Sequence, residues 1–376
     1  MQTGPSPTPA AFAGATLALE GGNLIDGTGA PAVANAVVLI SGDRILAAGS
    51  ADKVHVPAGV RTIDVHGGTI LPGFINAHVH RGFSEPNLSA WAEGGVTTVR
   101  DESTSPSQVA GLRDLRARIG RDPELARLIS AGSMLGVPGG YGDLTVDSTD
   151  AALQAVDQEI DRGVDAVKVA LEDGYAGQNG LPKPSPEFLR AVVQRAHSRG
   201  LPVSGHVTQA AYVQGLLDAG VDDIGHVPYD AVPDGVLRQM VDQGVYLVPT
   251  FTVFRNYVAS VDGCADNVRR FVALGGKVAL GNDYGGGPGE FELGIPMYEI
   301  ETMAQAGMSP MQIVQAATSN ASEVVGLDEE IGTVTAGKAA DILVVGGNPL
   351  VDLQALRKLQ TVIHSGAEIR SEPPSA

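Results

Sequence analysis

The sequence predicts an α/β protein: a (β/α)8 TIM barrel with a small flanking β-sandwich built from both chain termini. First, short apolar runs alternate with helical stretches over most of the 376 residues, as in a parallel sheet crossed by helices. Second, the helical stretches end in glycine-containing stops. Third, both ends of the chain have strand character. We expect the sandwich from residues 1–70 plus 333–376 and the barrel from residues 71–332.

Each predicted element follows from a local pattern. The eight expected barrel strands are residues 73–80, 96–101, 126–132, 165–171, 202–207, 222–227, 245–251 and 278–283. The helices expected between them are residues 108–120, 151–163, 186–200, 210–220, 234–244 and 268–276, with two more within 309–327. Strands of the sandwich are expected within residues 16–27, 35–50, 61–68, 340–348 and 360–370. Repeated strand–helix units imply a closed barrel, and the two β-rich ends are expected to pair beside it.

Composition narrows the class of partner. The formal net charge is −18, which argues against nucleic acid or an anionic membrane, because both need clustered Lys and Arg. No apolar stretch is long enough to cross a bilayer, and the first residues lack the basic and apolar regions of an intact signal peptide. We therefore expect a cytoplasmic protein with a small-molecule substrate; processed export and a homo-oligomer stay open. Cys264 is the only cysteine, so no internal disulfide can form.

Six side chains at or near the ends of expected strands can form one metal site. They are His78, His80, Lys168, His206, His226 and Asp283. Chemistry in a (β/α)8 barrel lies at the carboxyl ends of the strands. Side chains two residues apart on a strand point to the same side, so both imidazoles of the His-x-His pair can bind one cation. Imidazole and carboxylate are ligands that hydrolytic divalent cations use.

The lysine requires a separate argument. Lys168 lies in an otherwise apolar strand, where an unpaired ammonium is costly to bury, and an ammonium cannot bind a metal. Carbon dioxide can convert the amine into a carbamate, an anion whose two oxygens can bridge two cations. We therefore expect two divalent metal ions and a carbamate on Lys168. Zinc is the ion we expect, although Mn, Co, Fe and Ni also accept this ligand set.

Several motifs resemble the amidohydrolase superfamily. They are LPGFINAHVH (71–80), GVTTVRD (95–101), the strand lysine, two GHV runs, GND, and GLDEEIGTVTAGKAADILVVGGNPLVD (326–352). The resemblance covers nearly the whole chain from about Gly21 and is strongest to the imidazolonepropionase-like and Xaa-Pro dipeptidase (prolidase)-like hydrolases. It implies a binuclear centre. His78, His80 and Asp283 would hold the more buried metal, and His206 and His226 the more exposed one, with carboxylated Lys168 bridging.

The implied reaction is cleavage of an amide (C–N) bond in a small substrate, such as a dipeptide or an N-acyl amino acid, by metal-activated hydroxide. Asp283 would accept the proton of the attacking water and deliver it to the leaving nitrogen. His226 or Tyr229 would stabilise the oxyanion. Arg81 is a candidate for binding a substrate carboxylate, with a solvated surface arginine as the alternative. Tyr141 stands where many dipeptidase-like relatives carry a histidine, so it is a candidate for substrate binding, as is Tyr229.

Three alternative functions stay open. An esterase, lactonase or phosphotriester hydrolase can use the same metal centre. A mononuclear deaminase shares the barrel and the His-x-His pair, but Lys168 counts against it. A catalytically inactive relative would have lost ligands, and this chain lacks none of the six.

Overall fold

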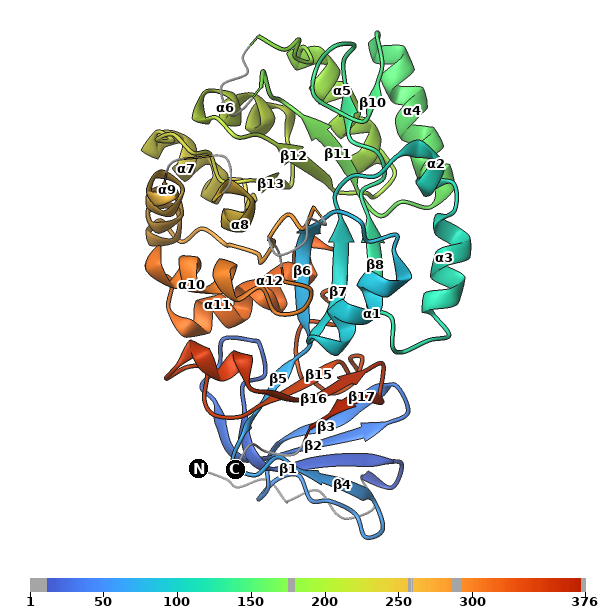
Figure 1. Cartoon of the computed structure of the whole chain (residues 1–376), viewed down its shortest axis with the longest axis vertical. Coiled ribbons are helices and arrows are strands. Elements are labelled where there is room, and N and C mark those ends of the chain that lie inside the picture. Colours follow the sequence, from blue (N-terminus) through green and yellow to red (C-terminus); the bar gives the residue numbers. More distant parts are fainter. Residues whose placement is uncertain (1–11, 175–179, 256–257, 259, 286–291, 373–376) are drawn as a thin grey trace.

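The computed structural model describes residues 12–174, 180–255, 258, 260–285 and 292–372. It confirms an α/β protein in which parallel strands and their helices lie above a separate sheet that both chain ends build (Figure 1). Within these described ranges, no helix combines the length and the apolar character that crossing a membrane requires.

The separate sheet joins the two ends of the chain. Its strands are β1 (Leu17–Leu24), β2 (Val33–Ser41), β3 (Arg44–Ser50), β4 (Arg61–Asp64), β5 (Thr69–Pro72), β15 (Ile342–Val345), β16 (Leu359–His364) and β17 (Ala367–Ser371). The strand order is β17-β16-β15-β5-β1-β2-β3, and β4 pairs with β1. The junction is antiparallel, with Ile70 opposite Val344 and Pro72 opposite Ile342. The expected pairing of the two β-rich ends is therefore present.

The alternation of side chains explains why this sheet forms. Leu17 and Leu19 of β1 pack in one apolar cluster, together with Ile342 and Val344 of β15. Ala18, between the two leucines, belongs to a second cluster. Successive side chains on a strand point to opposite faces, so this sheet buries apolar residues on both.

The parallel strands form two hydrogen-bonded ladders. One contains β6 (Phe74–Val79), β7 (Val96–Asp101) and β8 (Arg127–Ser130). The other, in spatial order, contains β10 (Leu144–Thr145), β9 (Leu135–Gly136), β11 (Val167–Ala170), β12 (Val203–His206), β13 (Asp223–Gly225) and β14 (Tyr246–Val248). Among the residues placed in strands, no ladder joins β8 to β9, so closure of the barrel stays a prediction.

The eighth expected strand, residues 278–283, is a segment of isolated bridges rather than a strand of a ladder. Val278 bridges to Leu247, and Tyr284 bridges to Val79. The segment still donates and accepts backbone hydrogen bonds on both sides, with Ala279 N to Leu247 O at 3.0 Å and Ala77 N to Leu280 O at 2.7 Å. Regular pairing is interrupted because Asp283 has a φ of 54° in the left-handed region.

Twelve α-helices and one 3₁₀-helix are described within the ranges above. They are α1 (Glu85–Glu93), α2 (Pro106–Val109), α3 (Leu112–Ile119), α4 (Thr149–Arg162), α5 (Pro186–Ser198), α6 (Ala210–Ala219), α7 (Asp234–Asp242), α8 (Phe251–Phe254), α9 (Asp262–Ala273), α10 (Met297–Gln305), α11 (Pro310–Ala317), α12 (Ser319–Val324) and the 3₁₀-helix η2 (Leu353–Arg357). Glycine stops at Gly163 and Gly220 are confirmed, with φ of 94° and 90°. The expected helices did not include α1, α8 or α10, and the predicted helix at 108–120 is divided into α2 and α3.

Candidate metal centre

The six predicted ligands all line one cavity of about 410 Å³. The four histidines come from the carboxyl ends of the parallel strands or from the residues just beyond them, as expected for this fold, whereas Lys168 lies inside a strand. His78 lies on β6 and His80 just after it, Lys168 on β11, His206 on β12 and His226 just after β13. Asp283 lies between the two bridging residues Val278 and Tyr284, directly before the second. The structure therefore brings together residues that are far apart in the sequence.

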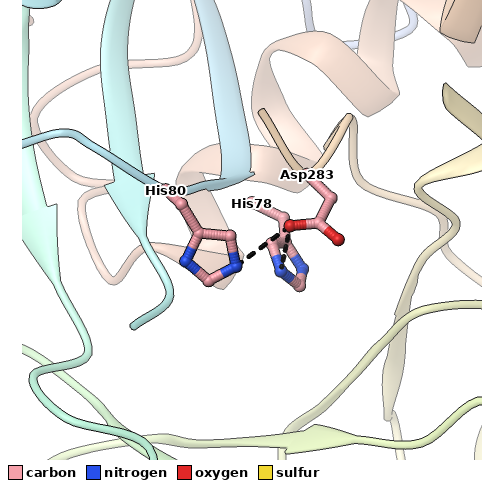
Figure 2. Close-up of side chains that lie close together, drawn as sticks. All are labelled: His78, His80 and Asp283. Atoms are coloured by element: carbon pink, nitrogen blue, oxygen red, sulfur yellow. Dashed lines mark ion pairs between the residues drawn. The ribbon is translucent and has the colours of Figure 1, made fainter. Parts of the chain in front are cut away.

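One half of the site is a compact triad, shown in Figure 2. Ligand atoms of His78, His80 and Asp283 all lie within 4.8 Å of one another. The Asp283 Oδ1 atom is 3.0 Å from His80 Nε2 and 3.5 Å from His78 Nε2. His80 Nδ1 is 3.0 Å from the carbonyl oxygen of Ser103, so donation to that oxygen leaves Nε2 free for a cation. This geometry fits one divalent metal ion.

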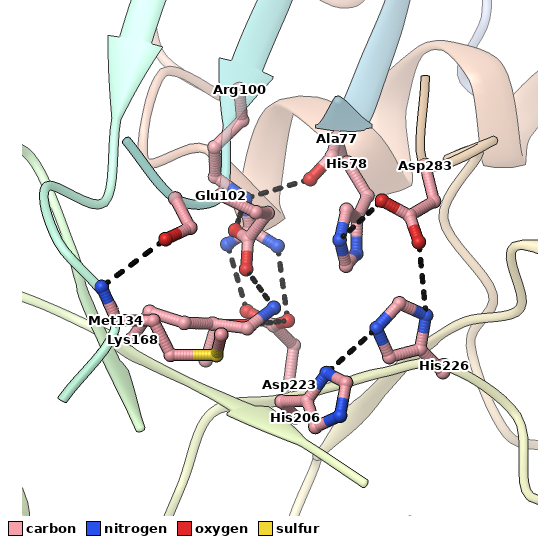
Figure 3. Close-up of polar contacts among 12 residues, drawn as sticks. Ala77, His78, Arg100, Glu102, Met134, Lys168, His206, Asp223, His226 and Asp283 are labelled. Carbon is pink, nitrogen blue, oxygen red and sulfur yellow. Dashed lines mark hydrogen bonds and ion pairs between the residues drawn. The ribbon is translucent and has the colours of Figure 1, made fainter. Parts of the chain in front are cut away.

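The other half holds its side chains in contacts with each other, as Figure 3 shows. His226 Nε2 lies 2.9 Å from His206 Nδ1, and His226 Nδ1 lies 2.8 Å from Thr250 Oγ1. The Lys168 ammonium is paired with the carboxylate of Glu102, and both side chains are almost fully buried. A cation here would have to replace the contact between the two imidazoles.

Buried histidines at this site are set up as neutral ligands. Burial, followed by the charge of Lys168, lowers the pKa of His78 well below 6.5, and burial and neighbouring cations do the same at His206 and His226. His78 Nδ1 and His206 Nε2 are buried with no hydrogen-bond partner. A buried nitrogen without a partner is costly, and a metal ion removes that cost.

His80 differs from the other three histidines. Burial lowers its pKa, but the hydrogen bond and charge of Asp283 and the charge of Asp101 more than offset burial and raise the pKa to about 9. This imidazole and the Asp283 carboxylate therefore form an ion pair when no cation lies between them.

Two glycines explain why the ligands can approach so closely. A Cβ on Gly225 would lie 2.8 Å from Lys168 Nζ, and one on Gly281 would lie 2.7 Å from His78 Cβ. The space beside the predicted ligands therefore depends on glycine in the second GHV run and in GND.

Three residues at the predicted metal centre have a strained backbone. His226, Thr250 and Asp283 have φ of 114°, 55° and 54°, a region that non-glycine residues rarely adopt. Such outliers persist only where the surrounding structure holds them, and they cluster at functional sites. Two of the three, His226 and Asp283, line the cavity, and the Thr250 hydroxyl contacts His226 Nδ1.

Sequence reasoning missed several supporting residues. Glu102 directly follows β7 and pairs with Lys168, while Arg100 of β7 makes a two-pronged ion pair with Asp223 of β13, at 2.8 and 3.0 Å. An acidic residue after an expected strand is a usable signal for Glu102. Nothing in a local pattern shows that Arg100 and Asp223 meet.

A second set of missed residues supports His226. Glu299 of α10 is fully buried and accepts hydrogen bonds from the backbone nitrogens of Phe251 and Thr252 and from the Thr252 hydroxyl. These contacts fix the start of α8, directly after Thr250. Burial raises the pKa of Glu299 to about 7. Thr250 thereby has a fixed place from which its hydroxyl meets His226.

The predicted substrate-binding residues are placed differently from one another. Tyr141 lines the cavity and stacks on His206, with ring centroids 4.4 Å apart. Arg81 is exposed, donates from Nε to the carbonyl oxygen of Gly285 and lines a neighbouring hollow. Tyr229 is not among the residues lining the 410 Å³ cavity. Its backbone nitrogen donates to the carbonyl oxygen of Thr208.

Known proteins resemble the chain over most of its length. It is 25% identical to the ochratoxinase of Aspergillus niger over 91% of this chain and 84% of that enzyme. The crystal structure of that ochratoxinase superposes with a TM-score of 0.80, 21% identity and coverage of 96% of both chains. A Xaa-Pro dipeptidase with bound methionine superposes with a TM-score of 0.83, 23% identity and coverage of 94% of this chain and all of that one.

The family assignment rests on a match to the amidohydrolase family model over residues 69–369. That range contains all six predicted ligands and the strands that carry them. The family consists of metal-dependent enzymes with a TIM barrel and an additional domain, and the prediction of an enzyme that hydrolyses amide bonds is confirmed. The chain is therefore a member of the amidohydrolase family.

Proposed function

We propose that this protein is a binuclear metal-dependent amidohydrolase that cleaves a C–N bond of a small substrate. The observation that carries the proposal is the convergence of ligand atoms from His78, His80 and Asp283 within 4.8 Å, on a cavity that Lys168, His206 and His226 also line. Such mixed ligand sets suit two hydrolytic cations, and zinc is the proposed metal.

In this proposal the ligands divide between two cations. His78, His80 and Asp283 hold one, and His206 and His226 hold the other. Lys168 would help to hold both cations as a carbamate, which would form when the neutral amine adds to carbon dioxide: an N–C bond forms, and one proton leaves. The ion pair with Glu102 must then open, because a carbamate is an anion.

Catalysis would depend on what the chain holds at the cavity. When bound, divalent cations lower the pKa of a water and polarise a carbonyl. Asp283, only 12% exposed, accepts the proton of the attacking water through a carboxylate oxygen and delivers it to the leaving nitrogen. The water oxygen joins the carbonyl carbon, the C–N bond breaks, and an acid and an amine are released. His226, whose Nδ1 lies 2.8 Å from Thr250 Oγ1, would stabilise the oxyanion through the cation that it holds.

The architecture around the site is part of the proposal. Residues 71–332 would close into a complete (β/α)8 barrel, and residues 1–70 with 333–376 would form the flanking β-sandwich. The bridges of Val278 and Tyr284 to strands β14 and β6 support closure on that side, and the pairing of β5 with β15 supports the shared sandwich.

Two measurements test the proposal. Metal analysis of fully active protein should give two equivalents per chain, and one equivalent would favour the deaminase. A panel of N-acyl amino acids, dipeptides and esters should then be offered to the metal-loaded enzyme. We expect the enzyme to hydrolyse amides. Cleavage of the esters but not of the amides would favour the esterase alternative. Val351→Ala, at a side chain that is 82% exposed, is the control.

A further inference from the structure

The cavity has an apolar wall beside the predicted metal ligands. Met134, Tyr141, Val253 and Phe254 line it. The Tyr141 ring stacks on His206 at an interplanar angle of 17°, and the Phe254 ring stands edge-on to His226 with centroids 6.0 Å apart. Flat faces and edges of aromatic rings are surfaces on which another ring packs well. This wall therefore offers a place for an apolar or aromatic group next to the scissile bond.

The cationic side chains that line the described cavity already face carboxylates, and His80 Nε2 lies 3.0 Å from Asp283 Oδ1. Among its described lining residues, Lys168 is the only lysine or arginine, and its ammonium is already paired with Glu102. Two more carboxylates, Asp143 and Asp283, line the same cavity. The residues that the structure does not describe add no cationic side chain, because residues 175–179, 256–257, 259 and 286–291 contain no Lys, Arg or His. A substrate carboxylate would therefore meet no basic side chain on this wall.

Arg81 is the arginine nearest to the ligands in sequence. Its side chain is exposed and its Nε donates to Gly285 O at 2.8 Å, so it is engaged at the rim. It lines a neighbouring hollow with Phe83 and Asn87. The guanidinium thus lies outside the cavity that Tyr141 and Phe254 line.

We propose that the substrate enters this cavity with an uncharged, apolar group, preferably an aromatic ring, packed between Tyr141 and Phe254, and that it carries no carboxylate there. This inference rests on the proposed function and narrows its substrate class. Burying an apolar ring in such a pocket is favourable, whereas a carboxylate there would lie beside the carboxylates of Asp143 and Asp283 without an unpaired cationic side chain.

Matched substrates separate charge from size. N-propylbenzamide and N-benzoyl-β-alanine have the same scissile bond and nearly the same length, and they differ in a methyl against a carboxylate. We expect kcat/KM of the metal-loaded enzyme to be at least about tenfold higher for the uncharged member. N-propylacetamide, which lacks the ring, should be about tenfold poorer than N-propylbenzamide.

Variants test which residues set the preference. Phe254→Ala should reduce the ratio of kcat/KM between the benzamide and the acetamide by about tenfold, mainly through KM, and Phe254→Leu should recover most of it. In Arg81→Ala the preference for the uncharged member should persist. Val351→Ala is the control for handling and stability.

The outcomes distinguish this inference from the proposed function. The inference would be wrong if the enzyme hydrolysed amides but preferred N-benzoyl-β-alanine, and if Arg81→Ala removed that preference. The proposed amidohydrolase function would be unaffected by that result. An unchanged benzamide-to-acetamide ratio in Phe254→Ala would also overturn the inference. If no member of the panel, charged or uncharged, is hydrolysed at full metal loading, the proposed function fails and the inference fails with it.

Discussion

The two halves of the predicted metal centre differ in how ready they are for a cation. In the first half, ligand atoms of His78, His80 and Asp283 already converge within 4.8 Å. In the second, His206 and His226 contact each other at 2.9 Å, and Lys168 is held by Glu102. The backbone thus preorganises the first half, whereas the second half must exchange protein contacts for metal and carbon dioxide. We therefore expect the first half to fill first.

The most severe test of this comparison is Asp283→Asn. If Asp283 both holds a metal and moves the proton, kcat should fall by more than the ~10²–10⁴ typical of losing one acid–base group. The fold and part of the metal should remain. Turnover and metal content of the purified variant decide the matter, and near-normal kcat at full metal loading would remove Asp283 from catalysis.

Removing the proposed bridging side chain, Lys168, should weaken metal binding selectively in the second half of the site. Lys168→Ala should lose one of two metal equivalents and reduce activity by about 100-fold, because second-half ligands alone bind weakly. Short carboxylic acids, or bicarbonate added with them, should restore part of both. Lys183→Ala removes a lysine that pairs with Asp173 at the surface instead, and should change neither. Two tightly bound metals in Lys168→Ala would rule out the bridging role.

A finer test concerns the support of His226. Thr250→Val keeps the shape of the side chain and removes the hydroxyl 2.8 Å from Nδ1. Loss of such a supporting contact typically costs 10–100-fold in metal affinity. The chelator concentration that removes the second metal should therefore be about 10–100-fold lower for the valine variant than for the parent protein. Thr250→Ser keeps the hydroxyl and should bind metal nearly as the parent does. Equal affinity in the valine and serine variants would show that the hydroxyl does not orient the ligand.

The smallest effect is expected at the amino end of the parallel strands. Asp341, just before β15, pairs with Arg127 of β8 at 2.9 Å. Burial raises its pKa, but Arg127 and then His364 more than offset burial, so the pKa lies below 3.8. A carboxyl group with a depressed pKa stabilises the fold above its unfolded value, and that stability is lost as the pH falls through the folded value.

Asp341→Asn should therefore lower the free energy of unfolding at pH 7 by about 1–3 kcal/mol. The gap from the parent should close as the pH falls below about 4. Urea unfolding at both pH values checks this, with metal content measured alongside. Unchanged metal content would show that the two ends of the strands act independently. A difference in unfolding free energy that grows as the pH falls would contradict a lowered pKa of Asp341.

Local patterns were sufficient to predict that the six proposed ligands line one cavity, but not to predict their partners. Each imidazole lies near the end of a strand or just after it, the apolar residues of that strand predict it, and the carboxyl ends of parallel strands meet by geometry. Glu102 pairs with Lys168 across 66 residues, and Arg100 meets Asp223 across 123. These contacts depend on side-chain packing in three dimensions, which no short window contains.

Boundaries failed where the backbone is strained. The strand predicted for residues 245–251 ends at Val248, because Thr250 adopts φ of 55° before α8 begins. A β-branched residue with positive φ is an outlier that propensity does not anticipate. The same applies to the bridging segment that ends at Asp283, so the two misjudged strands are also those that shape the site.

The pairing of β5 with β15 has a consequence for how the chain is made. Strand β5 has β1 on one side and β15 on the other, and β6 follows it almost at once. During synthesis the backbone groups on one edge of β5 therefore lack their partner strand until residues 342–345 have left the ribosome. An open edge of this kind invites pairing with other chains. The nascent protein thus relies on its last strands to close a sheet that its first strands begin.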